Sequence, residues 1–187
     1  MILSSAMMTA GIGALASVDQ NHRALGIGLS VLGGFGVGGI IIPAATILTI
    51  VCPDDVIATA TAITFSVRLI GGSIGYAIYF NVFENKFTDV FPTLVGGAVA
   101  QAGLPITQIV GFLEALASQN QTAVAEIPGL TPAILEAAQE AVQETYVAAF
   151  KRVYLVSIAF GGAAVVASIF LGNIKKYMVD RVAVDIH

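Results

Sequence analysis

The segment from Val56 to Phe83 reads VIATATAITFSVRLIGGSIGYAIYFNVF and is long and apolar enough to cross a membrane. A helix rises 1.5 Å per residue and the hydrocarbon core of a bilayer is about 30 Å thick, so a span needs about 20 mainly apolar residues. Arg68 is the single charged residue inside the segment. The segment therefore predicts a transmembrane helix with one cation near its middle.

Three further apolar stretches lie on either side of this segment, at residues 2–18, 24–51 and 153–171. The first is only just long enough for a span, and its start lacks the positive charge of a secretory signal peptide. The sequence predicts an all-α polytopic membrane protein with four transmembrane helices. An extramembrane loop at about 84–150 precedes the last helix, and a tail at 172–187 follows it.

The composition of the 187-residue chain agrees with a membrane protein. Hydrophobic residues make up 57% of the chain and charged residues 11%, whereas soluble domains have about 45–50% and about 25%. The mean hydropathy is +0.89. The net charge of −4, with eight Lys and Arg together, speaks against a nucleic-acid partner. We expect a lipid bilayer around the chain.

No constellation of residues in the sequence indicates an enzyme. Cys52 is the one cysteine, and the two histidines, His22 and His187, are far apart in the sequence, so no metal-ligand spacing occurs. The glycines from Gly33 to Gly39 lie inside an apolar span instead of at a strand-to-helix turn, which excludes a dinucleotide loop. We expect a protein that is not an enzyme and that holds no metal or cofactor.

The loop at 84–150 is expected to contain helices. Four prolines, at 92, 105, 128 and 132, prevent it from being one helix. Apolar residues at helical spacing from Ile106 to Ser118 predict a short helix at the membrane interface. Thr131-Pro132 is a helix start that should continue into the last span. The carboxylates at 136, 140 and 144 then share one face, which we expect to face water.

The orientation of the chain is indicated by two weak signals. Lys175, Lys176 and Arg181 favour a cytoplasmic tail, although the opposite side also carries positive charges. Asn120-Gln121-Thr122 is a glycosylation sequon in the long loop, which makes Asn120 a candidate site if that loop is extracellular.

The second span is rich in glycine. Gly34 and Gly38 form a small-xxx-small pair, and Pro43 follows them. Small residues let helix backbones approach closely, and proline permits bending where neighbours satisfy the freed backbone groups. These residues indicate either static packing or a helix that flexes during gating.

The third span carries a polar and small-residue face that we call the Arg68 face. It consists of Thr64, Arg68, Gly71, Gly75 and Tyr79, which recur at three- and four-residue steps. A charge at the bilayer centre costs at least about 2.5 kcal/mol on insertion scales, so Arg68 should face protein or water. The face could line a substrate pathway or an interface between helix bundles, or Arg68 could bond backbone carbonyls of a neighbouring helix. The spans hold no Asp or Glu, so a counter-ion must come from elsewhere.

Two stretches of the sequence resemble a known transporter family. Residues 52–61, CPDDVIATAT, and 64–79, TFSVRLIGGSIGYAIY, are similar to fungal fourteen-helix major facilitator transporters of the trichothecene efflux pump and siderophore-iron transporter branch. The tail at 174–187 resembles their cytoplasmic C-terminus, and the long loop before the last helix is also a feature of that branch.

The resemblance implies where the chain belongs in such a transporter. Its four spans would match helices eleven to fourteen, the middle pair lining the cavity or the contact between halves and the outer pair lying outside. It also implies a plasma-membrane location. The N-terminal half and the coupling carboxylates would lie beyond this sequence, so we expect the chain to need those helices, or another membrane subunit, as its partner.

Three functions remain open at this point. The first is the C-terminal part of a secondary active transporter for a small-molecule substrate, with proton-coupled efflux of a toxin or drug. The second is uptake of ferric siderophores by a transporter of the same branch. The third is a small non-transporting membrane protein that assembles through its glycine-rich helix faces.

Overall fold

The computed structural model describes residues 1–18, 22–118 and 121–171. These residues form helices and no strands, which confirms the all-α fold. The helices are α1 (Ile2–Ala14), α2 (Arg23–Val51), α3 (Ile57–Gln101), α4 (Ile106–Ala117), α5 (Gln121–Ala125) and α6 (Pro132–Ile169). Short 3-10 turns follow α1 at Leu15–Ser17 and precede α3 at Asp54–Val56.

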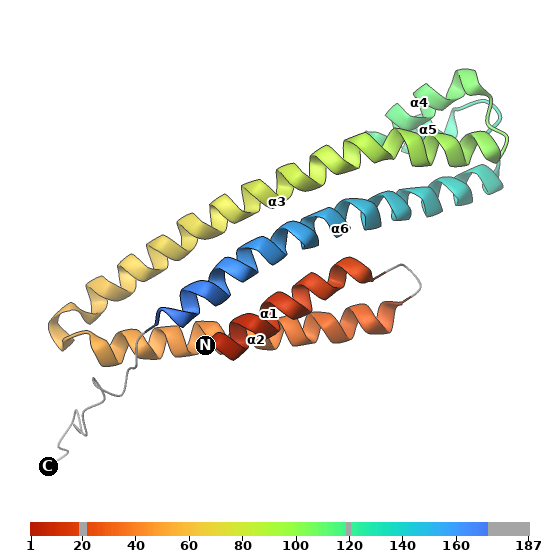
Figure 1. Ribbon diagram of the computed structural model, residues 1–187. Helices are drawn as coiled ribbons and strands as arrows, with labels where there is room; N and C mark the ends of the chain where they lie inside the picture. The colour runs from red at the N-terminus through yellow and green to blue at the C-terminus, as the bar shows by residue number, and fades with distance from the viewer. Residues whose placement is uncertain (19–21, 119–120, 172–187) are drawn as a thin grey trace, which may run out of the picture.

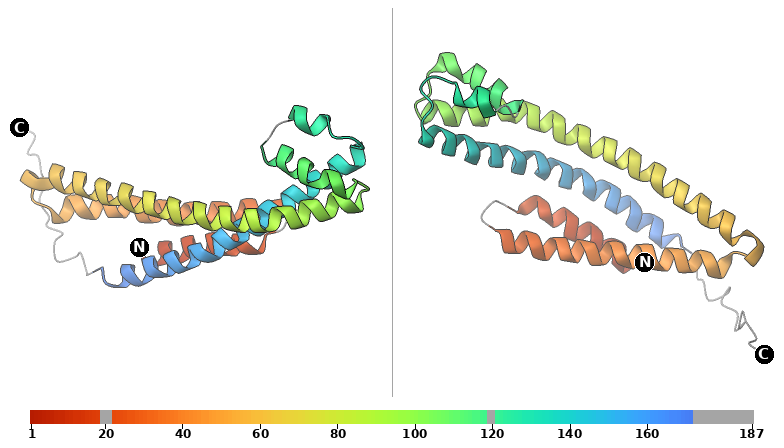
Figure 2. Two further views of the ribbon diagram at one scale, coloured as in Figure 1. Left: turned by 90° about the horizontal axis from the view of Figure 1, so that it is seen from above. Right: turned by 180° about the vertical axis from the view of Figure 1, so that it is seen from behind.

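The helices that carry the apolar spans lie in an open array with the order α2, α1, α6, α3 (Figure 1). α1 packs between α2 and α6, and α6 packs between α1 and α3. α2 and α3 meet near their connection and diverge from there, as the view from behind in Figure 2 also shows. The array therefore has α1 and α6 at its centre and α2 and α3 at its two edges.

The predicted spans can be compared with the helices. Three helices, α2, α3 and α6, are long and apolar enough to cross a membrane. The expected first span appears as a shorter apolar helix at Ile2–Ser17. The predicted second span at 24–51 coincides with α2 to within one residue. Cys52-Pro53 ends α2 where the sequence places the break.

The third predicted span is the first part of a longer helix. α3 runs for 45 residues to Gln101, with Pro92 inside it, whereas we expected the span to end near Phe83. A proline removes one backbone hydrogen bond and disfavours a helix interior. Here the residues around Pro92 are held by packing, because Phe91 and Val95 are buried against the neighbouring helices. Tertiary contacts therefore outweigh the helix-breaking tendency.

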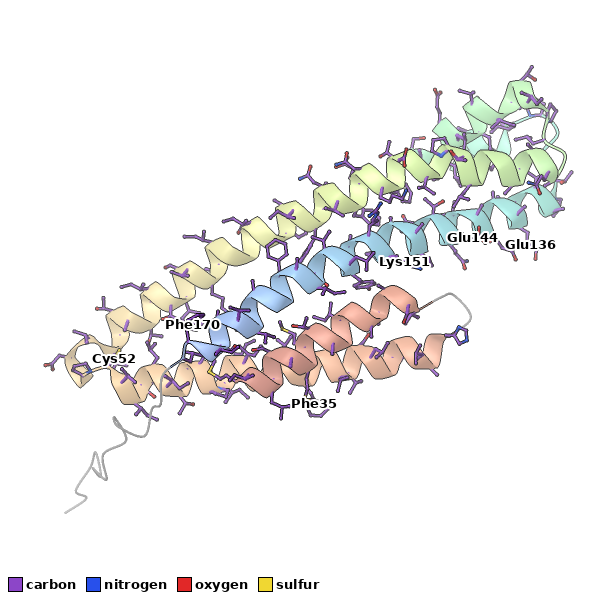
Figure 3. All side chains as sticks on the ribbon, in the orientation of Figure 1. Phe35, Cys52, Glu136, Glu144, Lys151 and Phe170 are labelled. Carbon is purple, nitrogen blue, oxygen red and sulfur yellow. The ribbon has the colours of Figure 1, made fainter. Side chains whose placement is uncertain are left out.

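The last helix starts where the sequence predicts and continues without interruption into the apolar segment. The Thr131 hydroxyl accepts a hydrogen bond from the Ile134 backbone nitrogen at 3.4 Å, and Pro132 is the first helical residue. The three carboxylates at 136, 140 and 144 are all exposed, and Figure 3 shows Glu136 and Glu144 on this helix. Their predicted exposed face is confirmed.

The end of the molecule away from the α2–α3 connection is a small folded unit that we call the cap. It consists of the last part of α3, α4, α5 and the first part of α6 (Figure 1). Its hydrophobic core comprises Phe91, Val95, Val99, Leu104, Phe112, Ile134, Ala138 and Ala141. Most of the expected extramembrane loop is therefore helical and packed.

The predicted helix at 106–118 is present as α4 and forms one wall of the cap. Its Phe112 is fully buried, while Ile106 at its start is 83% exposed. The chain reverses before α4 at Gly103, whose φ of +101° suits glycine and few other residues. There the Leu104 backbone nitrogen donates to the Val99 carbonyl at 2.9 Å, as in a Schellman helix end. The apolar face of α4 thus packs against protein.

Aromatic rings connect α3 and α6 between the apolar spans and the cap. The rings of Phe83 and Phe150 lie 4.9 Å apart, and those of Phe87 and Tyr146 lie 5.0 Å apart. Lys151 and Arg152 follow directly on α6. Aromatic side chains beside cations are typical of the membrane–water interface, so we expect that interface to lie near this cluster.

Candidate functional site

The seam between α1 and α6 is built from small and hydroxyl side chains. Ser5 and Ser168 share a buried hydrogen bond of 2.8 Å between their hydroxyl oxygens. One turn further along α1, Thr9 lies so close to Gly161 that a side chain at position 161 would collide with it. α1 and α6 can therefore approach each other closely. Close packing of this kind drives helix association in lipid, where burial of apolar surface gives no hydrophobic gain.

The seam between α1 and α2 depends on a second set of glycines. A Cβ atom added at Gly36 would lie 2.5 Å from the backbone nitrogen of Met8, and one at Gly11 would lie 2.7 Å from that of Gly33. A Cβ at Gly39 would lie 2.6 Å from the hydroxyl oxygen of Ser4. Backbone or near-backbone atoms fill these positions, so only glycine fits without movement.

These contact glycines of α2 were not predicted from the sequence. Gly33, Gly36 and Gly39 recur every third residue, whereas the pair chosen from the sequence was spaced by four. A spacing of three also keeps residues near one helix face. That spacing is the sequence signal that could have identified the α1–α2 seam.

The predicted glycines Gly34 and Gly38 lie on a different face of α2. A Cβ added at either would meet nothing within 4 Å. Together with Phe35, Ile42 and Pro43 they line a shallow apolar groove on α2. Phe35 is 73% exposed and projects from α2 in Figure 3. The structure therefore brings the three predicted residues of α2 together, on a face that the described residues of the chain leave open.

The Arg68 face is also open over most of its length. Every side chain at 62–74 is exposed, Thr64 and Arg68 included, and a Cβ added at Gly71 or Gly75 would meet nothing within 4 Å. The Thr64 hydroxyl donates to the carbonyl of Ala60 at 2.9 Å, within its own helix. The glycines of this face are thus not used for packing within the described chain.

Tyr79 is the exception on the Arg68 face. Its ring meets Phe160 of α6 edge-on, with 5.8 Å between the ring centroids. From this point toward the cap, α3 packs along α6. Tyr79 therefore marks the end of the open part of α3.

Arg68 has no acidic partner among the residues that the structure describes. The one ion pair found in those residues joins Lys86 and Asp89, at 3.4 Å on the surface. Asn120, the glycosylation candidate, and the tail at 172–187 lie outside the described residues.

The sequence matches known proteins over its whole length. Residues 1–187 match the family described as "Fungal trichothecene efflux pump (TRI12)". The chain is 29% identical over 182 residues to the trichothecene efflux pump TRI12 of Fusarium sporotrichioides, a match that covers 97% of this chain and 30% of that protein. It is 27% identical to the trichothecene efflux pump TRI12 of Trichoderma arundinaceum over 100% of this chain and 32% of that protein.

A third relative carries a broader name. The chain is 26% identical over 170 residues to the MFS-type efflux transporter ffsH of Aspergillus flavipes, covering 90% of this chain and 28% of that protein. No solved structure matches the chain. The chain spans about a third of the length of the curated relatives it matches. With the apolar helices and the match to the whole chain, this identifies an integral membrane protein that belongs to the fungal trichothecene efflux pump family.

Proposed function

We propose that this chain is the C-terminal part of a secondary active transporter that exports small organic molecules, toxins or drugs, at the expense of a proton gradient. The observation that carries the proposal is the pair of open faces on the edge helices. On α2, a Cβ atom added at Gly34 or Gly38 would meet nothing within 4 Å, and on α3 the same holds for Gly71 and Gly75 beside the exposed Arg68. Such faces suit helices that line a pathway or contact another helix bundle.

Efflux is favoured over siderophore uptake by the relatives. Those named above are called efflux pumps or an efflux transporter. The substrate class that we propose is therefore a small organic toxin of the kind those names describe. Since the chain spans about a third of such a protein, we propose that it does not transport by itself. Alternating access requires two helix bundles that rock around a site between them.

The two edge helices would have different roles in that transporter. On α3, a polar face with a central cation is suited to the substrate pathway or to the contact with the other bundle. On α2, Pro43 frees a backbone carbonyl one turn earlier, so the helix can bend beside Gly38. We propose that α2 bends and that α1 and α6 serve as the fixed support.

A self-contained, non-transporting bundle is the less favourable alternative. Such a protein should cover its central cation and its glycine faces with its own helices. Arg68, Gly71 and Gly75 are instead open in the described chain. A second membrane subunit, or the remaining helices of a transporter, would be needed to cover them.

Toxin export from cells tests the proposal. A yeast host that lacks its own export pumps would express the full-length transporter containing this segment, the segment 1–187 alone, or the full-length Arg68→Ala variant. We expect lower retention of a radiolabelled trichothecene with the full-length protein only, and loss of that effect when an uncoupler dissipates the proton gradient. Val67→Ala serves as the matched control, because Val67 is an exposed neighbour on the same helix. Equal export by the segment alone would contradict the dependence on other helices.

The orientation has its own test. We propose a plasma-membrane protein with a cytoplasmic tail and the cap outside, which would make Asn120 accessible to glycosylation. Glycosidase treatment should then increase the gel mobility of the protein, and Asn120→Gln should remove that shift. An unchanged mobility of the untreated and treated protein would count against this orientation.

A further inference from the structure

The part of α3 between Ala62 and Ile74 is an apolar helical segment that the rest of the described chain leaves exposed. All of its side chains are exposed, and the exposure of Val67 and Leu69 is 64% and 70%. The most apolar window of α3 has no buried residue at all. Lipid can cover the apolar side chains, but it cannot satisfy a guanidinium.

Arg68 lies too deep for its side chain to reach the lipid headgroups easily. It is twelve residues from Val56 and fifteen from Phe83, which corresponds to about 18 Å and about 22 Å along a helix. Snorkelling serves cations near helix ends, not at the middle of a span. The guanidinium therefore needs a polar partner at the same depth.

The chain itself cannot provide a carboxylate at that depth. No Asp or Glu occurs at 2–18, 24–51, 56–83 or 153–171. The same absence applies to a second copy of the chain, so a homodimer would place two unpaired cations in the membrane. The carboxylate must come from a different polypeptide segment.

The glycines beside Arg68 indicate what kind of group approaches. Gly71, Gly72 and Gly75 follow Arg68 by three, four and seven residues, and a Cβ added at any of them would meet nothing within 4 Å. These spacings put them beside Arg68 on the helix surface. Glycines at such positions permit another helix backbone to come close, whereas a small anion that binds the guanidinium has no need of them.

We propose that Arg68 pairs with an Asp or Glu side chain on a transmembrane helix outside residues 1–187, and that this helix packs against Gly71 and Gly75. The inference rests on the proposed function, because that helix belongs to the remainder of the transporter. A planar guanidinium can hold a carboxylate through two parallel hydrogen bonds, which fixes the relative position of the two helices. The pair thus determines how α3 docks, in addition to neutralising its charge.

Charge reversal in the full-length transporter tests the pair. Arg68→Glu places two carboxylates together and Arg68→Gln leaves one unpaired, so both should lower the amount of protein in the membrane several-fold. Arg68→Lys keeps the positive charge and should lower the amount of protein in the membrane less than the other two changes. Each intramembrane Asp or Glu outside this segment is then changed to Arg in the Arg68→Glu background. We expect one such change to restore the membrane amount, and a disulfide to form when cysteines replace both members of that pair.

A matched control distinguishes loss of the ion pair from a general sensitivity of this helix to substitution. Leu69→Ala, on the adjacent exposed residue, should leave the membrane amount unchanged. The proposal is overturned if no acidic position restores Arg68→Glu, or if Arg68→Gln keeps its membrane amount and only weakens transport of anionic substrates. The disulfide and the membrane amount do not depend on transport. A disulfide that forms in a protein without export would contradict the proposed function alone and leave the ion pair standing.

Discussion

Gly33, Gly36 and Gly39 of α2 and the glycines beside Arg68 on α3 look alike in the sequence but are in opposite situations in the structure. On α2, Gly36 faces the backbone of Met8 so closely that a Cβ atom would lie 2.5 Å from it. On α3, Gly71 and Gly75 face open space. α2 therefore uses part of its glycines for contacts inside this chain. The glycines of α3 beside Arg68 make no such contact within the described residues.

This difference divides the chain into a part that packs within the described residues and a part that stays exposed. α1 packs against α2 and α6 through small residues, and the cap has a hydrophobic core of its own. The residues of α3 at 62–74 are all exposed in the described chain. Changes in the first part should act on the chain by itself, and changes in the second should act only when the rest of the transporter is present.

The largest effect is expected in the core of the cap. Phe112 is fully buried, and Phe112→Ala should destabilise the cap by about 3–5 kcal/mol. Hydrogen exchange of the α4 amides would show the loss as faster exchange. Ile106→Ala, at an 83% exposed position of the same helix, is the control and should change stability by less than about 0.5 kcal/mol. Equal effects of both would mean that the cap is not packed around Phe112.

The next largest effect is expected at the α1–α2 seam. Gly36→Ala inserts a methyl group against the Met8 backbone and should cost about 1–3 kcal/mol, because two helices must separate. Gly34→Ala, two residues away in open space, should be neutral or stabilising by up to about 1 kcal/mol. Thermal unfolding in detergent micelles measures both. If Gly34→Ala lowered the thermal stability as much as Gly36→Ala, the distinction between the two faces of α2 would be wrong.

A smaller effect is expected for the hydroxyl pair of the α1–α6 seam. Ser5→Ala and Ser168→Ala each remove one member of a buried 2.8 Å hydrogen bond. Hydrogen bonds between membrane helices are worth about 0.6 kcal/mol on average, so a double-mutant cycle should give a coupling of that order. A coupling of zero would show that close packing alone holds the seam.

The smallest effect in this chain, and the sharpest test of the comparison, is at Gly71. Gly71→Leu adds a large side chain where the described chain has open space, so residues 1–187 should not be destabilised. In the full-length transporter the same change should reduce the amount of assembled protein in the membrane. Tolerance in both would indicate that lipid, and not a helix, covers this face.

Much of the fold follows from the sequence because local signals mark the helix ends. Cys52-Pro53 ends α2 and Thr131-Pro132 starts α6, as residue chemistry predicts. The continuation of α3 past Phe83 was not predicted, because Pro92 alone indicates a break. The burial of Phe91 beside it is a tertiary effect that no local pattern contains.

The candidate site was predicted in part. The Arg68 face follows from helical periodicity, and the structure places Thr64, Arg68, Gly71 and Gly75 on one open stretch. Which face of α2 packs inside the chain could not be deduced. That choice depends on how α2 is rotated toward Met8 of α1, and glycine lies on both faces. The glycines on the two faces differ by only one residue in their spacing. The position of α1 is what shows which set of glycines packs.

α3 is one continuous helix that connects the membrane-spanning part of the molecule to the cap. Its 45 residues extend about 68 Å, more than twice the thickness of the hydrocarbon core, and carry the Arg68 face at one end and a wall of the cap at the other. Between these two ends, the rings of Phe83 and Phe87 pack against Phe150 and Tyr146 of α6. Because one continuous helix joins the two ends, we expect a tilt of the part of α3 before Phe83 to move the cap as well. A spectroscopic label on the cap would detect that movement from the aqueous side.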